Sequence, residues 1–313
     1  MKEHFLDFER PLAEIFEKIE ALQAASNEDP ELLGQIEKLR KEEKKLKNKI
    51  FSKLSIWQKV QVARHPQRPH TSDYIKAVFS DFIELHGDRQ FADDQSIIGG
   101  IAEIEGNSVM VIGHEKGRET EEKVKRNFGM PQPEGYRKAK RLMQLAERFN
   151  LPVITFIDTA GAYPGIEGEE RGQSEAIATN LAVMSKLNTP IIVIITGEGG
   201  SGGALAIGVG DHIAILEHAT YSVASPEACA SIIWRTAEKA SDAAEAMKVS
   251  AQELIKIKIV DEIIKEPLGG AHRDYKEISE SVRSCILKNL GTLLSKPLDD
   301  LLEARYKKLL EIG

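Results

Sequence analysis

The stretch that decides the fold of this chain is PIIVIITGEGGSGGALAIGVGD, residues 190–211. Its first six residues have the uninterrupted apolar pattern of a buried strand, and the glycine-rich part leads into small and aliphatic residues that predict a short helix. Glycines allow backbone N–H groups to approach a ligand closely, and a helix N-terminus directs such donors toward negative charge. The stretch therefore predicts a loop that holds an anion, either a phosphate or an oxyanion formed during a reaction.

Two motifs with different chemistry can be read in the same letters. Residues 197–202, GEGGSG, match the dinucleotide-binding fingerprint, and Glu217 follows at a suitable distance for a ribose hydroxyl. Residues 199–203, GGSGG, match the nucleophile elbow of serine hydrolases, with Ser201 as the nucleophile. The motifs alone do not decide between a dinucleotide-binding loop and a hydrolase nucleophile.

A third interpretation needs no reactive side chain. The backbone amides of Gly202 and Gly203 would form an oxyanion hole that stabilises charge developing on a substrate oxygen. A Walker loop is excluded, because no Lys-Ser or Lys-Thr pair follows the last glycine. The remaining alternative is structural, a tight packing turn between strand and helix.

Composition limits the class of protein. The 313 residues suffice for a full core, and 42% hydrophobic with 29% charged residues is ordinary for a globular protein. A net charge of −7 argues against general binding of nucleic acid or membrane surfaces. Cys229 and Cys285 have no CxxC spacing and cannot form a zinc site alone. With no secretory signal or apolar span apparent, we expect reduced thiols and a cytoplasmic location.

The chain divides into three predicted parts. Residues 1–65 carry apolar residues at three- and four-residue steps, broken at Ser26–Pro30, and predict an antiparallel helical hairpin that packs on the body or on a partner. Residues 66–270 alternate strands and helices and predict the catalytic core. Residues 271–313 form a helical C-terminal segment.

Within the core, the pattern predicts an α/β fold with a mainly parallel sheet. The expected elements are a hairpin of 97–104 and 109–112 turning at Gly106-Asn107, helices 136–149 and 174–187, strands 153–157 and 190–195, and a helix capped by Thr71 or Ser72. In such sheets ligands bind at the carboxyl ends of the strands, so the loop 158–165, DTAGAYPG, should lie beside the glycine-rich loop. Asp158 is either a site residue or a loop cap.

Other polar groups give weaker signals. The histidines His114, His212, His218 and His272 show no metal-ligand spacing and are poor candidates for a general base. A basic run between Lys116 and Arg126 is interrupted by glutamates, which is typical of a solvated face and less often of a phosphate-steering patch.

Several longer strings resemble the carboxyltransferase alpha subunit of bacterial acetyl-CoA carboxylase. The resemblance covers essentially the whole chain, with a small departure at 166–168. It rests on the glycine-rich loop together with GHEKGR (113–118), RNFGMP (126–131), PEGYRK (133–138), FIDT (156–159), GAYPG (161–165), EERGQS (169–174), YSV (221–223), SPE (225–227), EPLGGAHR (266–273) and the linker ARHPQRP (63–69).

This resemblance implies a crotonase (ClpP-like) fold and an enzyme. Proteins of this family move CO2 from carboxybiotin, tethered to the biotin carboxyl carrier protein, onto acetyl-CoA to give malonyl-CoA, the committed step of fatty-acid synthesis. They work with a beta subunit of the same fold that carries a zinc ribbon, in an α2β2 arrangement beside biotin carboxylase. No metal is implied for this chain, and the alternatives are a crotonase-fold serine hydrolase or a non-catalytic scaffold.

The resemblance also assigns site residues. The amides of Gly202 and Gly203 would face the ureido oxygen of biotin, and Ser201 would be a turn residue. The substrate-binding residues carried over are Gly161, Ala162, Tyr163, Gly199, Gly200 and Ser201.

Overall fold

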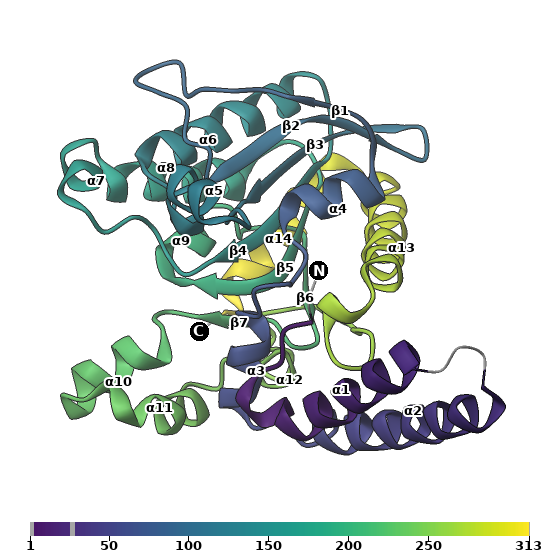
Figure 1. Cartoon of the computed structure of the whole chain (residues 1–313). Helices are drawn as coiled ribbons and strands as arrows, with labels where there is room; N and C mark the ends of the chain where they lie inside the picture. The colour runs from purple at the N-terminus through teal and green to yellow at the C-terminus, as the bar shows by residue number, and fades with distance from the viewer. Residues whose placement is uncertain (1–2, 26–28, 313) are drawn as a thin grey trace.

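A computed structural model describes residues 3–25 and 29–312 of the chain. Its centre is an eight-stranded sheet in the order β1-β2-β3-β4-β5-β6-β8, with β7 beside β5 (Figure 1). β1, β2 and β3 are antiparallel, and every pairing from β3 onward is parallel. The strands are β1 (Ser80–Glu84), β2 (Ile97–Ile104), β3 (Asn107–His114), β4 (Val153–Thr159), β5 (Ile191–Gly200), β6 (His212–Leu216), β7 (Thr220–Ser222) and β8 (Glu262–Ile264).

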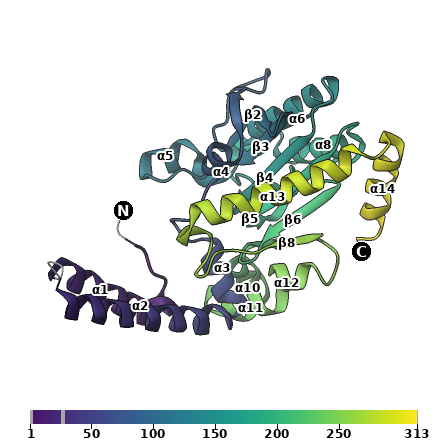
Figure 2. The ribbon, with the colours of Figure 1, turned by 90° about the vertical axis from the view of Figure 1, so that its right-hand side faces the viewer.

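Helices cover both faces of the sheet. Figure 2 shows α13 (Tyr275–Leu294) crossing the face opposite α6 (Pro133–Arg148) and α8 (Gln173–Lys186). The mainly parallel α/β sheet predicted from the sequence is confirmed. The other helices are α3 (Ile56–Ala63), α4 (Thr71–Val78), α5 (Thr120–Lys125), α7 (Ile166–Glu170), α9 (Ser201–Leu205), α10 (Pro226–Trp234), α11 (Ala240–Met247), α12 (Ala251–Leu254) and α14 (Leu298–Leu310), with short 3-10 turns at Asp7–Glu9, Asn127–Gly129, Ala237–Lys239 and Ala271–Arg273.

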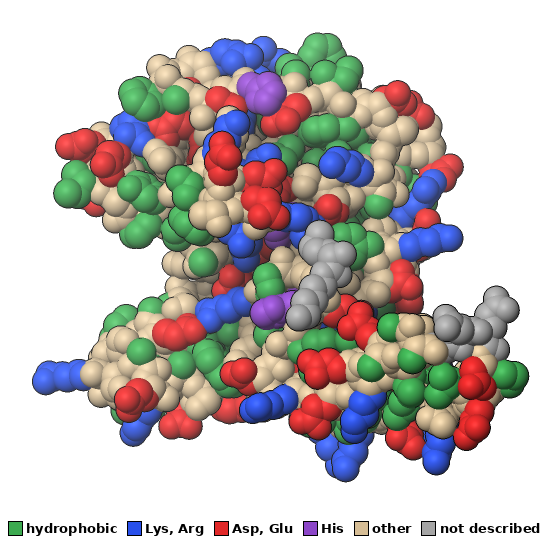
Figure 3. Space-filling model, viewed as in Figure 1, with side chains coloured by type: hydrophobic (Ala, Val, Ile, Leu, Met, Phe, Trp, Pro, Cys, Tyr) green, Lys and Arg blue, Asp and Glu red, His purple; other side chains and the backbone are tan. Residues whose placement is uncertain are grey.

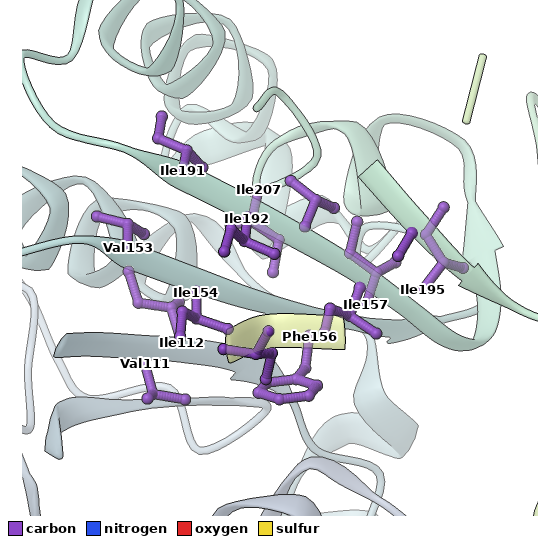
Figure 4. Packing of buried hydrophobic residues seen from close by; sticks show 14 of the residues in the cluster. Val111, Ile112, Val153, Ile154, Phe156, Ile157, Ile191, Ile192, Ile195 and Ile207 are labelled. Atoms are coloured by element: carbon purple, nitrogen blue, oxygen red, sulfur yellow. The ribbon is translucent and has the colours of Figure 1, made fainter. Parts of the chain in front are cut away.

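Isoleucine and valine dominate the core around β4 and β5. Their side chains are fully buried, as expected for parallel strands covered on both faces. Figure 4 shows Ile154 and Phe156 of β4 and Ile192 of β5 among the packed side chains of this core. The same cluster includes Ile278, Val282, Ile286 and Leu290 of α13, so residues after 271 share the core of the preceding part. The three-part division itself stays a prediction.

The N-terminal segment forms the expected helical hairpin of α1 (Arg10–Ala25) and α2 (Pro30–Phe51), which lie side by side in Figures 1 and 2. Leu12, Phe51 and Val62 form a small core at its base. Residues 26–28 of the predicted break lie outside the described residues. Asp29 caps α2 by accepting the Glu31 N–H at 2.9 Å.

Three local predictions were wrong. The β2–β3 turn is Glu105-Gly106 and not Gly106-Asn107, because Ile104 pairs with Asn107 and both turn residues have the positive φ of a type I′ turn, 46° and 74°. His70, not Thr71 or Ser72, is the N-cap of α4, since its backbone N–H donates to the Asp73 carboxylate. The strand predicted to end at residue 195 continues through the glycines to residue 200.

Candidate active site

A sharp turn joins β5 to the short helix α9. Ser201 has a left-handed φ of 51°, and Gly200, the N-cap, offers no side chain to bond the first helical N–H groups. The first amides of a helix have no acceptor inside it, so the Gly202 and Gly203 N–H groups are available as donors. A methyl group on Gly202 would contact only the Ile177 side chain, at 3.5 Å. The space beside Gly202 is therefore open, with an apolar wall.

The loop after β4 packs directly on this turn. Thr159 pairs with Gly199, and the Thr159 hydroxyl accepts the Gly161 N–H at 3.1 Å. A methyl group on Gly203 would lie 2.5 Å from both the Ala162 nitrogen and the Gly161 carbonyl carbon. The structure thus brings the two predicted loops into contact at the carboxyl ends of β4 and β5.

Three of the other predicted substrate-binding residues have supporting contacts. Gly199 packs on the Tyr221 ring and Gly200 on the Ala160 carbonyl, where a methyl group would lie 2.6 Å and 2.2 Å away. The Tyr163 N–H donates to the Pro131 carbonyl at 3.0 Å, and its hydroxyl lies 3.3 Å from Glu167. Tyr163 is therefore fixed to the loop before α6, while Ser201 is exposed at the turn.

Nothing around Ser201 activates it as a nucleophile. Its hydroxyl makes no hydrogen bond with any described residue, so no histidine or carboxylate within this set is placed as its base. Nucleophilic serine needs such a base within hydrogen-bond reach. The elbow motif is therefore present in backbone shape without its chemistry.

The dinucleotide motif also fails on geometry. Gly197 and Gly199 lie within β5, not in a turn, and α9 has only five residues. Glu217, the candidate ribose ligand, accepts the backbone N–H of Glu266 at 3.2 Å. The fingerprint requires a turn that opens a longer helix.

The histidines lie in three different surroundings. Burial lowers the pKa of His114, at the end of β3, to about 4, and backbone groups of Gly203 and Phe156 close to its ring partly offset this shift. His272 stacks on His65 with ring centres 3.7 Å apart. His212 lies 3.2 Å from Glu262. Within the described residues, His212, Glu262 and Cys285 are the one group of three such side chains close enough to share a metal ion. His212 and Glu262 begin β6 and β8 and Cys285 belongs to α13, so the group lies away from the glycine turn.

An ion-pair network lies behind the turn. The Lys116 ammonium is 2.7 Å from Asp158 and 3.0 Å from Glu198, and Arg64 is 2.6 Å from the other Glu198 oxygen and also pairs with Glu227. Burial alone would raise the pKa of Glu198, but the cations Lys116 and Arg64 lower it to about 2. The predicted basic run is therefore split, with Lys116 in this network and Arg118 paired with Asp73.

A cavity of about 160 Å³ adjoins the network, lined by residues that include Arg64, Lys116, Lys123 and Asp158. Figure 3 shows Lys, Arg and His side chains in the hollow between the α/β core and the helices below it. Sequence reasoning did not place Lys116 and Arg64 in this network, because ion pairs between residues far apart in the chain leave no local pattern. It singled out Asp158, whose carboxylate accepts the Glu198 N–H and pairs with Lys116.

Solved structures share this fold at low sequence identity. A transcarboxylase 12S matches 74% of this chain and 42% of its own with a TM-score of 0.61 at 17% identity. A Pseudomonas malonate decarboxylase hetero-tetramer matches 74% and 90% with a TM-score of 0.58 at 18% identity. The beta subunit of P. aeruginosa geranyl-CoA carboxylase matches 78% and 46% with a TM-score of 0.58 at 16% identity. The fold is that of the crotonase-fold carboxyltransferases, as predicted.

The sequence gives a finer assignment. Residues 5–313 match the family model described as acetyl co-enzyme A carboxylase carboxyltransferase-like, and the chain belongs to this family. It is 59% identical over 317 residues to the acetyl-coenzyme A carboxylase carboxyl transferase subunit alpha of Vibrio cholerae serotype O1, covering 100% of this chain and 99% of the relative. It is 58% identical over 314 residues, with the same coverage, to the protein of that name from Pseudomonas paraeruginosa. The resemblance and the transferase class are confirmed, and the hydrolase and scaffold alternatives are not supported.

Proposed function

We propose that this chain is the alpha subunit of a carboxyltransferase that moves CO2 from carboxybiotin to acetyl-CoA, giving malonyl-CoA. The observation that carries the proposal is the β5–α9 turn, which presents two backbone donors and no activated side chain. The family of the chain supplies the reaction. No helix among residues 3–25 and 29–312 combines the length and apolar character needed to cross a membrane.

The donor set fits a substrate on which oxygen becomes negative. The Gly202 and Gly203 amides have no acceptor within α9, and the Ile177 side chain beside Gly202 is apolar. Carboxybiotin supplies the CO2, and its ring nitrogen can take the methyl proton of acetyl-CoA, so neither step requires a nucleophile from the protein. Preorganised backbone donors contribute about 3 kcal/mol each to such a transition state.

The other site residues are assigned by contact. Gly161, Ala162 and Ser201 border the space in front of the amides, and we propose that they line the biotin site. Gly199, Gly200 and Tyr163 hold the two loops together behind it. Their role would be to keep the donors in place as the substrate loses CO2.

The partners follow from the same proposal. A beta-type chain with a zinc ribbon would bind acetyl-CoA in an α2β2 complex, with biotin supplied by the carrier protein and recharged by biotin carboxylase. We expect the site of this chain to use no metal. A cytoplasmic location stays a prediction, which fractionation of cells would check.

The test is reconstitution. The full chain, purified with and without its beta-type partner, is assayed for malonyl-CoA formation from acetyl-CoA and carboxybiotin, and the metal content of each chain is measured. Transfer only in the complex, with zinc only in the partner, is expected. Full activity from this chain alone would contradict the shared site, and a complex that forms but transfers no CO2 would overturn the function.

A further inference from the structure

The end of β5 is held in an irregular register against β4. Ile157 of β4 pairs with Ile195 of β5, and Thr159 pairs with Gly199, so two steps along β4 match four along β5. The extra residues are in Thr196–Glu198, immediately before the glycine turn. A bulge of this kind re-aims the residues that follow it and leaves backbone groups without ladder partners.

Buried charged side chains take the place of the missing partners. The Glu198 N–H donates to the Asp158 carboxylate at 2.9 Å, and the Thr196 carbonyl accepts from the Arg68 guanidinium at 2.6 Å. Asp158 is 3% exposed and Arg68 is 1% exposed. Because unsatisfied buried backbone groups cost free energy, these two contacts stabilise the bulge.

The fit between Asp158 and the bulge is close. A methyl group on Gly197 would lie 2.3 Å from the Asp158 oxygen that accepts the Glu198 N–H, so only glycine allows the carboxylate to reach this position. Lys116 then bridges the same oxygen to the Glu198 carboxylate, at 2.7 and 3.0 Å. The backbone and the side chain of Glu198 are therefore both fixed, four residues before Gly202.

We propose that Asp158 is a positioning residue for carboxyl transfer, which holds the bulge in the geometry that aims the Gly202 and Gly203 amides at the substrate oxygen. Lys116 supports it by fixing the carboxylate. The effect of Asp158 on carboxyl transfer rests on the proposed function. The claim that Asp158 holds the Glu198 amide does not depend on it.

The chain offers a matched control in Asp211. Its side chain is 3% exposed, against 4% for the Asp158 side chain, and is ion-paired with Arg305 at 2.7 Å. It accepts the N–H of Ile191, at the opposite end of β5. The variants Asp158→Ala, Asp158→Asn, Asp211→Ala and Asp211→Asn would each be made in the full chain and assayed in complex with the beta-type partner. Hydrogen exchange of the Glu198 and Ile191 amides is measured in parallel.

We expect Asp158→Ala to lower kcat by about 10²-fold with an unchanged KM for acetyl-CoA, as for displacements of about 1 Å at other reacting centres. Asp158→Asn keeps an acceptor for the Glu198 N–H, so its kcat should be about tenfold higher than that of Asp158→Ala and about tenfold lower than that of wild type. The Asp211 variants should lose stability and keep kcat. Exchange at Glu198 should rise only in Asp158→Ala, and exchange at Ile191 only in Asp211→Ala.

Equal kcat losses at the two positions, or a Glu198 amide that stays protected in Asp158→Ala, would overturn the inference. If Asp158→Ala does not fold, Asp158→Asn decides. A wild-type kcat in Asp158→Asn would overturn the inference, and a loss of kcat larger than in Asp211→Asn supports it. If the wild-type complex transfers no CO2, the proposed function is overturned instead. The exchange data then still show whether Asp158 holds the Glu198 amide.

Discussion

At its amino end β5 is held by Asp211, which accepts the Ile191 N–H at 2.7 Å and pairs with the fully buried Arg305 of α14. At its carboxyl end it is held by Asp158, which accepts the Glu198 N–H at 2.9 Å and pairs with Lys116. The same device, a buried carboxylate that accepts a strand N–H and pairs with a cation, occurs at both ends of one strand.

The difference lies in what the device holds. At the amino end the neighbouring pairings with β4 and β6 are regular, and Arg305 also donates to carbonyls of the segment that follows α8. At the carboxyl end the register is interrupted and the strand turns into the Gly202–Gly203 donors. Buried ion pairs thus serve architecture at one end and orientation of a site at the other, so burial and pairing alone do not identify a functional residue.

Of the variants that test this contrast between the two ends of β5, Gly202→Val should have the largest effect on carboxyl transfer. The first carbon of the new side chain has only Ile177 within 4 Å, at 3.5 Å, so the substitution fits into the open space beside Gly202, where we propose that the substrate oxygen binds. Transfer should fall by about 10²–10³-fold, as when an oxyanion donor is lost elsewhere. The measurement is kcat of the reconstituted complex together with the melting temperature of the variant, which should stay close to wild type.

Gly291→Val is the control for that substitution. Gly291 is an exposed residue near the end of α13, the helix that leads to α14, and a methyl group there has nothing within 4 Å. Its variant should keep full transfer.

Gly203→Val is less informative, because its first carbon would lie 2.5 Å from backbone atoms of Gly161 and Ala162 and would disturb the fold. Normal activity in Gly202→Val would remove the glycine amides from the mechanism.

A second prediction concerns acid stability at the carboxyl end. Burial lowers the pKa of His114 in the folded chain to about 4, from 6.5. The unfolded chain therefore binds this proton first as the pH falls, and the contribution of neutral His114 to stability is full above pH 6.5 and is lost toward pH 4. By this linkage the free energy of unfolding should fall by about 2 kcal/mol between pH 7.5 and pH 5 on account of His114.

The measurement is urea unfolding of wild type and His114→Leu at the two pH values. Between pH 7.5 and pH 5, the free energy of unfolding of His114→Leu should fall by about 2 kcal/mol less than that of wild type. His212→Leu at the amino end of β6 is the comparison, and its effect should be smaller, because Asp261 and Glu262 partly offset the burial that lowers the pKa of His212. An acid dependence unchanged in His114→Leu would show that the buried imidazole does not contribute.

The fold could be predicted because its signals are local. The buried strand 190–195, the helices near 136–149 and 174–187 and the hairpin at 97–112 each carry their own periodicity, and the order of strands and helices implies a parallel sheet. The errors came at boundaries, where tertiary contacts decide. Thr71 is the first residue inside α4 and not its cap, and its hydroxyl donates to the His114 carbonyl, which only the folded chain brings near.

The candidate site was predictable in part. Glycine spacing located the turn, and parallel strands predicted that the 158–165 loop would lie beside it. The bulge at Thr196–Glu198 could not be predicted, because it depends on Asp158, Lys116 and Arg68 from three other segments. The charges that orient this site are thus set by the three-dimensional pairing, whereas the donors are set by the local sequence.

Ser201→Ala should have the smallest effect, and it separates the backbone from the side chain at the turn itself. Ser201 is exposed, has a φ of 51°, and its hydroxyl bonds to no described residue. Alanine can keep this conformation at a similar cost, so the amides that follow should stay in place and kcat of the complex should remain within about threefold of wild type. A serine that acts as a nucleophile behaves differently, since its removal costs about 10⁶-fold in kcat. A loss of that order would mean that the Ser201 side chain takes part in the reaction. The carboxyl end of β5 would then be a nucleophile elbow like that of a serine hydrolase, and the contrast with the amino end of the strand would not describe its function.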